Sequence, residues 1–289
     1  MSTTTLDRRS PAARTTTGPG LSAPRILASE WIKAWTLRST TWTVGLTVVL
    51  MTGVTGLLAW AGTVSTEPDP GQPGVVVDVG DAASLITAGA FLAQVVLVVL
   101  GVLLITGEYR RGMVRSTMAA VPRRLPVLWA KATVLAVVAL ATGAVAVVTS
   151  ALVSAPFHDR LGVTLDLTSA ETLRILGGLP LYLAGIALYG FALAALLRSS
   201  AAALAIVLGQ LLVLETLIAN IPMRAFEVVA PFLPGTAGQR LIMDSETLTA
   251  MDSMGDGAHL TPWQGYGVLL AWVALLLTAA AVRLRKRDV

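Results

Sequence analysis

Six stretches of this sequence are apolar over lengths that could cross a lipid bilayer. A membrane-spanning helix needs about 20 mostly apolar residues to cover roughly 30 Å of hydrocarbon. Runs such as 95–100 are apolar on every face, whereas the strands of a membrane β-barrel would alternate apolar and polar positions. The pattern therefore predicts an all-α membrane protein with six transmembrane helices. These span approximately residues 40–62, 85–107, 125–153, 173–197, 201–221 and 262–284.

Polar residues mark two of these boundaries. Lys131 lies near the start of the third stretch, so we expect that turn in the headgroup region, with the ammonium group snorkelling outward. The fourth and fifth stretches are separated only by Arg198, Ser199 and Ser200, which is typical of a tight turn followed by a serine cap. We therefore expect a hairpin of two helices here rather than one long helix.

The overall composition excludes an ordinary soluble enzyme. Of the 289 residues, 55% are hydrophobic and 13% are charged, whereas soluble domains carry roughly 25% charged residues. Cysteine is absent, which excludes disulfides, iron–sulfur sites, thiolate zinc sites and cysteine nucleophiles. The two histidines, His158 and His259, lie far apart, which argues against a histidine-rich metal centre. Residues 1–24 are rich in Ser, Thr, Pro and Arg, so we expect a disordered tail before one transmembrane domain over 25–289.

Charge placement predicts the orientation. Most of the 21 lysines and arginines fall on one side of this topology: in the N-terminal region, in the loop after the second stretch, at the 198–200 turn and in the C-terminal tail. By the positive-inside rule this side is the cytoplasm, and six spans then leave both termini inside. The net charge of +4 is what remains of this asymmetry, and it gives no support for nucleic-acid binding.

A short amphipathic segment precedes the first stretch. Within residues 24–38, Leu27, Trp31 and Trp35 recur at every fourth position and share a helical face, while Lys33 lies elsewhere. Tryptophan prefers the headgroup level of a membrane, so the segment is expected to form an interfacial helix on the cytoplasmic leaflet. Two roles remain open for it, an anchor that sets depth and a lever that passes force to the first span.

The loop after the second stretch is the most informative part of the chain. Gly107 can end the span, and Pro122 ends a short segment in which Val114, Met118 and Val121 have helical spacing. A short amphipathic element of this kind suits a groove on another protein. A basic loop that only sets topology would not explain the acidic residue at the span end or the glycine and proline. The candidate functional residues here are Glu108, Tyr109, Arg110, Gly112, Arg115 and Pro122.

Polar residues inside the apolar stretches are also candidates, because burying them in lipid is costly. Gln94, Gln210 and Glu215 could line a cavity or could serve structure alone. Glu215 lies roughly 9 Å from the outer end of its stretch by helix rise, near enough for water or snorkelling to satisfy it. Tyr182 and Tyr189 share a helical face and are expected to pack.

The order of these motifs resembles a known family. The pattern of Glu108, Gly112, Pro122, Arg124 and Lys131 after the second of six spans resembles the coupling-helix region of type-2 ATP-binding-cassette permeases. Residues 105–110 and 119–124 are similar to permeases common in actinobacteria, and the likeness extends to 29–33 and 232–239.

The resemblance implies a bacterial plasma-membrane exporter. In this family two permease subunits, identical or different, form the membrane half, and a separate cytoplasmic ATPase docks on each. It implies that 108–122 is the docking element, that 24–38 is the connecting helix and that 222–243 forms re-entrant external helices. It further implies alternating access for an amphipathic or hydrophobic substrate.

The chain itself lacks the means to bind ATP. A phosphate-binding loop requires Gly-x-x-x-x-Gly-Lys-Ser/Thr, and none of Lys33, Lys131 and Lys286 follows a glycine. We therefore expect no cofactor on this chain, with ATP bound by the partner. An intramembrane enzyme would need a nucleophile and a base at one depth, and a channel or secondary transporter would need more intramembrane charge. A permease-like immunity or sensing partner remains an alternative.

Overall fold

The computed structural model describes residues 23–65, 80–110, 124–221, 224–253 and 257–286. These residues form helices and turns, with no β-strand among them. Within the same ranges, six helical segments are long and apolar enough to cross a membrane. They are Arg38–Val64, Ala82–Gly107, Leu125–Leu161, Ala170–Leu197, Ser200–Ile218 and Pro262–Arg285. The predicted all-helical architecture with six such helices is confirmed, as expected of a multi-pass membrane protein.

The first half of the chain supplies the amphipathic helix and three spans. The second span consists of two helices joined at Ala88 and Gly89, and the third continues into a short helical extension. The helices are α1 (Ala23–Thr36), α2 (Arg38–Ser65), α3 (Ala82–Thr87), α4 (Ala90–Arg110), α6 (Arg124–Ser154), η1 (Ala155–Phe157) and α7 (His158–Leu161).

The second half supplies three spans and a set of short helices between the last two. The fifth span is irregular, because a π-helix, η2 (Gly209–Leu214), interrupts it. The helices are α8 (Ala170–Leu197), α9 (Ser200–Leu208), α10 (Glu215–Asn220), α11 (Arg224–Val229), η3 (Ala230–Phe232), α12 (Pro234–Gln239), η4 (Arg240–Ile242), α13 (Ser245–Ser253) and α14 (Pro262–Lys286). We call residues 224–253 the α11–α13 segment.

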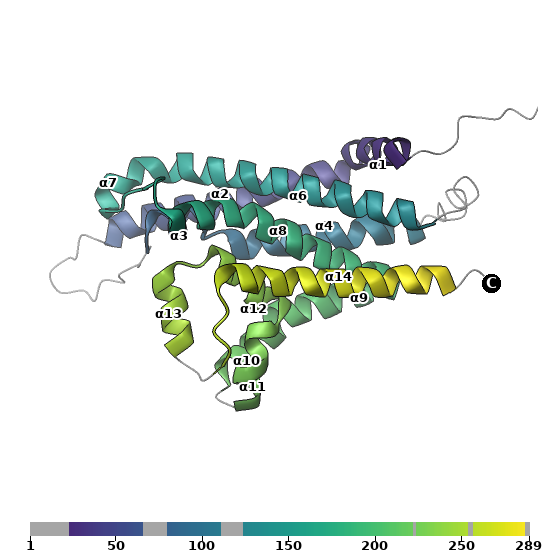
Figure 1. Cartoon of the computed structure of the whole chain (residues 1–289). Helices are drawn as coiled ribbons and strands as arrows, with labels where there is room; N and C mark the ends of the chain where they lie inside the picture. The colour runs from purple at the N-terminus through teal and green to yellow at the C-terminus, as the bar shows by residue number, and fades with distance from the viewer. Residues whose placement is uncertain (1–22, 66–79, 111–123, 222–223, 254–256, 287–289) are drawn as a thin grey trace, which may run out of the picture.

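Several chain ends meet at one end of the helix bundle. In Figure 1, α1, the described end of α4, the start of α6 and the end of α14 all lie toward the right. We call this the α1 end of the bundle. The helices α3 and α7 lie at the other end, and the α11–α13 segment projects from the side of the bundle (Figure 1).

Helix α8 forms the centre of the bundle. In its most apolar window 78% of the residues are buried inside the protein, against 22% for the first and fifth spans. It packs against α4, α6 and α14, and its side chains Tyr182, Leu183, Ile186 and Phe191 are almost fully buried. The other spans therefore surround α8 and present much of their apolar surface outward, which suits contact with lipid.

Small residues allow α8 to approach its neighbours closely. A Cβ atom on Gly101 of α4 would lie 2.3 Å from the carbonyl oxygen of Ala187, and one on Gly190 of α8 would lie 3.1 Å from the carbonyl oxygen of Val98. Packing of this kind between membrane helices depends on small residues that let the backbones approach. The α4–α8 contact therefore requires glycine at position 101.

The structure confirms the turn between the fourth and fifth spans. Helix α8 ends at Arg198, which adopts a left-handed conformation with φ of 59°, and the Ser199 hydroxyl accepts a hydrogen bond from the Ala202 backbone N–H at 3.3 Å. The second span ends at Gly107, as expected, and helix α4 continues for about one further turn to Arg110, because Gly107 keeps an ordinary helical conformation.

Replacement of Gly101 by alanine tests the packing of α4 on α8. The added methyl group would press on the Ala187 carbonyl, so Gly101→Ala is expected to destabilise the protein by roughly 1–3 kcal/mol. The control is Gly45→Ala on α2, where a Cβ atom meets nothing within 4 Å. Thermal unfolding in detergent should show a lower Tm for the first variant and an unchanged or higher Tm for the second. Equal Tm values would contradict this account.

Candidate functional site

A buried ionic cluster lies at the α1 end of the bundle. Glu30 of α1 and Lys131 of α6 are 5% and 3% exposed, and the Lys131 ammonium group donates a hydrogen bond to the Glu30 carboxylate. Lys33, one turn after Glu30, donates to the other carboxylate oxygen at 2.7 Å. We predicted that Lys131 snorkels to the headgroups. This prediction is wrong, because α1 lies against the start of α6 and supplies a buried acceptor.

The two faces of α1 explain how Glu30 becomes buried. Ile26, Glu30 and Ala34 recur at every fourth position and are 8%, 5% and 3% exposed. On the other side, the predicted face of Leu27, Trp31 and Trp35 is 39–49% exposed, and the two indole rings make an edge contact with centroids 6.0 Å apart. The spacing of apolar residues predicts the aromatic face but not the buried one, because the charged residue Glu30 interrupts the buried face.

The lysines hold Glu30 in its charged form. Burial raises the pKa of this carboxyl, but the charge and hydrogen bond of Lys131 and the contact with Lys33 outweigh burial, so the pKa lies below the ordinary value of 4.5. A buried ion pair adds little net stability, yet removal of one partner leaves an uncompensated charge. The cluster therefore ties α1 to the first turns of α6.

A cavity of about 630 Å³ lies beside this cluster. Residues of α1, α2, α4 and α6 and the α1–α2 junction line it, so it lies where α1 meets the first three spans. The lining residues are Glu30, Lys33, Ala34, Thr36, Leu37, Ser39, Thr40, Thr43, Leu100, Leu103, Leu104, Gly107, Lys131 and Val134.

The residues predicted to contact an ATPase are described only in part. Glu108, Tyr109 and Arg110 form the last turn of α4, and their side chains lie outside what the structure describes. Gly112, Arg115 and Pro122 also fall outside the described ranges. The segment 111–123 starts after α4 and ends before α6, and both helix ends lie at the α1 end (Figure 1). The docking element stays a prediction.

Two glutamines predicted as cavity-lining pair with tyrosines of α8. The Tyr182 hydroxyl donates to Oε1 of Gln94, and the Tyr189 hydroxyl donates to Oε1 of Gln210 at 2.5 Å. Gln94 and Tyr182 also border a cavity of about 230 Å³. The spacing of the tyrosines was visible in the sequence, but their partners were not, because the sequence does not specify which spans are neighbours.

Glu215 binds the start of α12. The carboxylate is 5% exposed and accepts hydrogen bonds from the backbone N–H of Gly235 at 3.1 Å and of Thr236 at 2.5 Å, and from the Thr236 hydroxyl at 2.9 Å. Of the two roles left open for Glu215, a structural one fits these contacts. Because α12 folds back onto the fifth span and its first-turn N–H groups need acceptors, the carboxylate is satisfied without water or snorkelling. The Pro234–Gly235 pair was the available signal, since proline favours a helix start.

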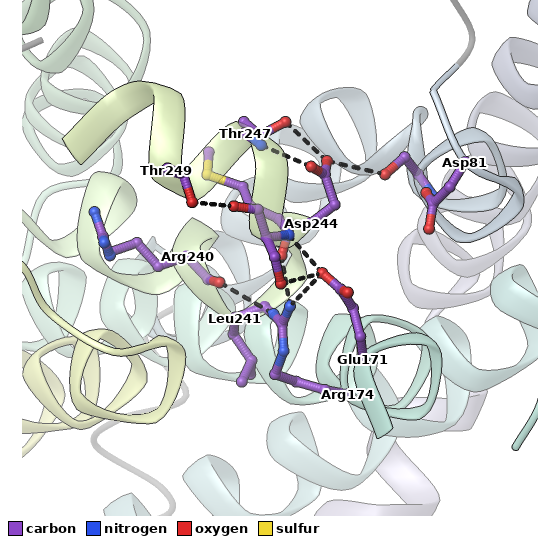
Figure 2. Close-up of polar contacts among 11 residues, drawn as sticks. Asp81, Glu171, Arg174, Arg240, Leu241, Asp244, Thr247 and Thr249 are labelled. Atoms are coloured by element: carbon purple, nitrogen blue, oxygen red, sulfur yellow. Dashed lines mark hydrogen bonds and ion pairs between the residues drawn. The ribbon is translucent and has the colours of Figure 1, made fainter. Parts of the chain in front are cut away.

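Side chains of α8 bind the backbone of the α11–α13 segment (Figure 2). Arg174 donates to the carbonyl oxygens of Leu241 and Met243, each at 2.8 Å. Glu171 accepts hydrogen bonds from the backbone N–H of Ser245 and from its hydroxyl, the latter at 2.6 Å. The Arg174 guanidinium group thus binds backbone carbonyls at the end of η4, and the Glu171 carboxylate binds the first backbone N–H of α13.

A second arginine connects parts of the same segment. Arg240 is 4% exposed, and its Nη2 lies 2.9 Å from each carboxylate oxygen of Asp252. Its Nε donates to the Leu260 carbonyl at 2.7 Å, just before α14 begins. Because a buried guanidinium group needs such partners, these bonds hold Arg240 to Asp252 of α13 and to Leu260 before α14.

The described residues contain no candidate metal cluster and one histidine–serine pair. They contain no group of three or more His, Asp or Glu residues that could hold a metal ion. His158 Nε2 lies 3.2 Å from the Ser154 hydroxyl, a pair that the sequence analysis did not identify. Ser154 is fully buried, however, so its hydroxyl is not placed to attack a substrate.

Comparison with known proteins leaves the family open. No family model matches this chain, and no curated protein matches it.

The ionic cluster predicts a pH dependence of stability. Because the folded-state pKa of Glu30 lies below 4.5, its contribution is present above pH 4.5 and is lost as the pH falls through the lowered value. Glu30→Gln removes the carboxylate that Lys131 and Lys33 contact, so it should cost roughly 1–3 kcal/mol at neutral pH and should flatten the acid side of the Tm profile. The control is Glu227→Gln, which removes a carboxylate from α11, outside the ionic cluster, and should leave the acid side of the Tm profile unchanged. If the Tm of Glu30→Gln fell at acid pH as steeply as that of the unsubstituted protein, the pH dependence would not come from Glu30.

Substitution of Glu215 tests its contact with α12. Glu215→Gln replaces one accepting oxygen by an amide that faces N–H donors, so the expected loss of stability is about 1–3 kcal/mol. Hydrogen exchange at Gly235 and Thr236 should become faster. Glu246→Gln, at an exposed position of α13, removes the same charge and should leave both amides protected. Equal exchange in the two variants would show that Glu215 does not hold α12.

Proposed function

We propose that this chain is the membrane-spanning permease subunit of an ATP-driven exporter of the ATP-binding-cassette type. In this proposal it works in a bacterial plasma membrane with a separate cytoplasmic ATPase and a second permease subunit, either a copy of this chain or a different one. Both termini lie in the cytoplasm, on the side of the α1 end. The six apolar helices and the motif order along the sequence support the proposal.

The Glu30–Lys131 contact is the observation that supports it most strongly. An ATPase that docks on residues 108–122 would push on the end of α4 and on the start of α6. Lys131 lies in the first turns of α6 and is bound to Glu30 of α1, which leads directly into α2. The ionic cluster therefore offers a path by which force on the docking element reaches the first span, in agreement with a lever role for α1.

Transport would follow from relative movement of these packed helices. Paired ATPases that close on ATP would bring the docking elements of the two permease subunits together, and the spans would switch a cavity between inward and outward access. The α11–α13 segment, held to α8 by Arg174 and to the fifth span by Glu215, would move with these spans as the re-entrant external part. A cavity between spans that are apolar over most of their length would suit an amphipathic or hydrophobic substrate.

Loss of the acidic residue at the docking element tests the proposal. Glu108→Ala should reduce the amount of ATPase that co-purifies with the tagged chain by about tenfold, the size expected for one lost charge-assisted contact. The measurement is ATP hydrolysis in the purified complex together with identification of a co-eluting protein that has a phosphate-binding loop. Membrane insertion should not change.

The control is Glu246→Ala, which removes a carboxylate from α13, outside the proposed docking element. It should retain the ATPase at the level of the unsubstituted protein. Absence of any ATPase in the unsubstituted preparation, or equal retention in Glu108→Ala, would overturn the proposed function.

A further inference from the structure

The cavity at the α1 end has two chemically different parts. Its exposed lining includes the hydroxyl groups of Thr36 and Ser39 and the ammonium-bearing side chain of Lys33, which is 38% exposed. Its buried lining includes Leu100 and Val134, which are 4% and 3% exposed. Such a lining matches a ligand with one polar and one apolar portion.

The cavity also has room for a ligand of moderate size. Its volume of about 630 Å³ lies within the range of roughly 300–1,000 Å³ that is typical of small-molecule sites. Gly107 borders it, and a Cβ atom there would meet nothing within 4 Å. The Thr40 hydroxyl oxygen in the lining is buried and has no hydrogen-bond partner in the described part of the protein. The cavity therefore combines unfilled space with a buried hydroxyl group that has no hydrogen-bond partner among the described residues.

The position of α1 places the cavity mouth at the lipid headgroups. Trp31 and Trp35 project from α1 and are 40% and 49% exposed, and exposed tryptophans favour the membrane interface. Among the described charged side chains that line the cavity, Lys33 and Lys131 are cationic and Glu30 is anionic. Cationic groups at this depth favour anionic lipids.

We propose that this cavity holds one anionic phospholipid from the leaflet at the α1 end. Its phosphate lies near Lys33, Thr36 and Ser39, and an acyl chain lies against Leu100 and Leu103. The inference rests on the position of the protein in a membrane and does not depend on the proposed transport function. A failed ATPase experiment would leave it intact.

Native mass spectrometry of the full chain in detergent tests the site. With added phosphatidylglycerol, the unsubstituted protein should retain one molecule, and phosphatidylcholine should be retained far less. Lys33→Gln and Leu103→Trp should each lower the retained phosphatidylglycerol by about tenfold, since the first removes a charge-assisted contact and the second fills the cavity.

Each variant has a matched control on the same helix. Arg25→Gln removes an exposed cation from α1 outside the cavity lining, and Leu92→Trp enlarges a side chain of α4 whose exposure of 39% is close to the 41% of Leu103. Both should retain the lipid and keep the Tm of the unsubstituted protein. Because Lys33→Gln also removes a contact with Glu30, lipid retention is compared at a temperature at which all four variants are folded.

Four results would overturn the proposal. Equal retention of phosphatidylcholine would exclude recognition of the anionic headgroup, and equal loss in Lys33→Gln and Arg25→Gln would indicate general surface charge. Displacement of the lipid by inorganic phosphate would assign the site to free phosphate. Unchanged retention in Leu103→Trp would place the lipid outside the cavity.

Discussion

The structure depends on one constraint, that polar groups buried in a lipid-embedded protein must find partners within it. Lipid offers no hydrogen bonds, so an unsatisfied backbone or side-chain group there is costly. The Lys131 ammonium group meets Glu30, the tyrosine hydroxyls of α8 meet glutamines of neighbouring spans, and the Glu215 carboxylate meets the N–H groups of α12. These polar contacts determine which helices are neighbours, because apolar packing alone does not distinguish between helices of similar hydrophobicity.

Helix α8 combines the two means by which membrane helices associate. Its glycines and alanines let α4 approach closely, and its polar residues bind elements that are distant in sequence. Near its start, Arg174 holds carbonyl groups of the α11–α13 segment, and along its length Tyr182 and Tyr189 reach the second and fifth spans. A movement of α8 would therefore displace most of the other helices of the bundle.

The sequence predicted the helices well because apolar length alone determines them. The six spans, the hairpin at Arg198 and the exposed aromatic face of α1 all follow from local pattern. The partners of Lys131 and Glu215 could not be predicted in the same way, because they depend on which segments fold back onto which spans. Lys131 was assigned to the headgroups, and Glu215 was placed within reach of water at the span end. For either residue, this placement holds only when no other element covers the polar group. The docking residues after Gly107 still rest on the sequence pattern.

The π-helix in the fifth span has a consequence for the geometry around Glu215. A π-helical turn accommodates an extra residue compared with an α-helix, and one residue of α-helix corresponds to a rotation of about 100°. Deletion of a single residue between Gly209 and Leu214 would let the span become a continuous α-helix. That deletion would leave the Glu215 carboxylate facing Gly235, whereas a regular α-helix that kept all of the residues would turn it away by about 100° with the same apolar length. The contact between the Glu215 carboxylate and α12 thus depends on the π-helix η2. In a chain with the same length and hydropathy but a regular α-helix in the fifth span, the carboxylate would point in a different direction.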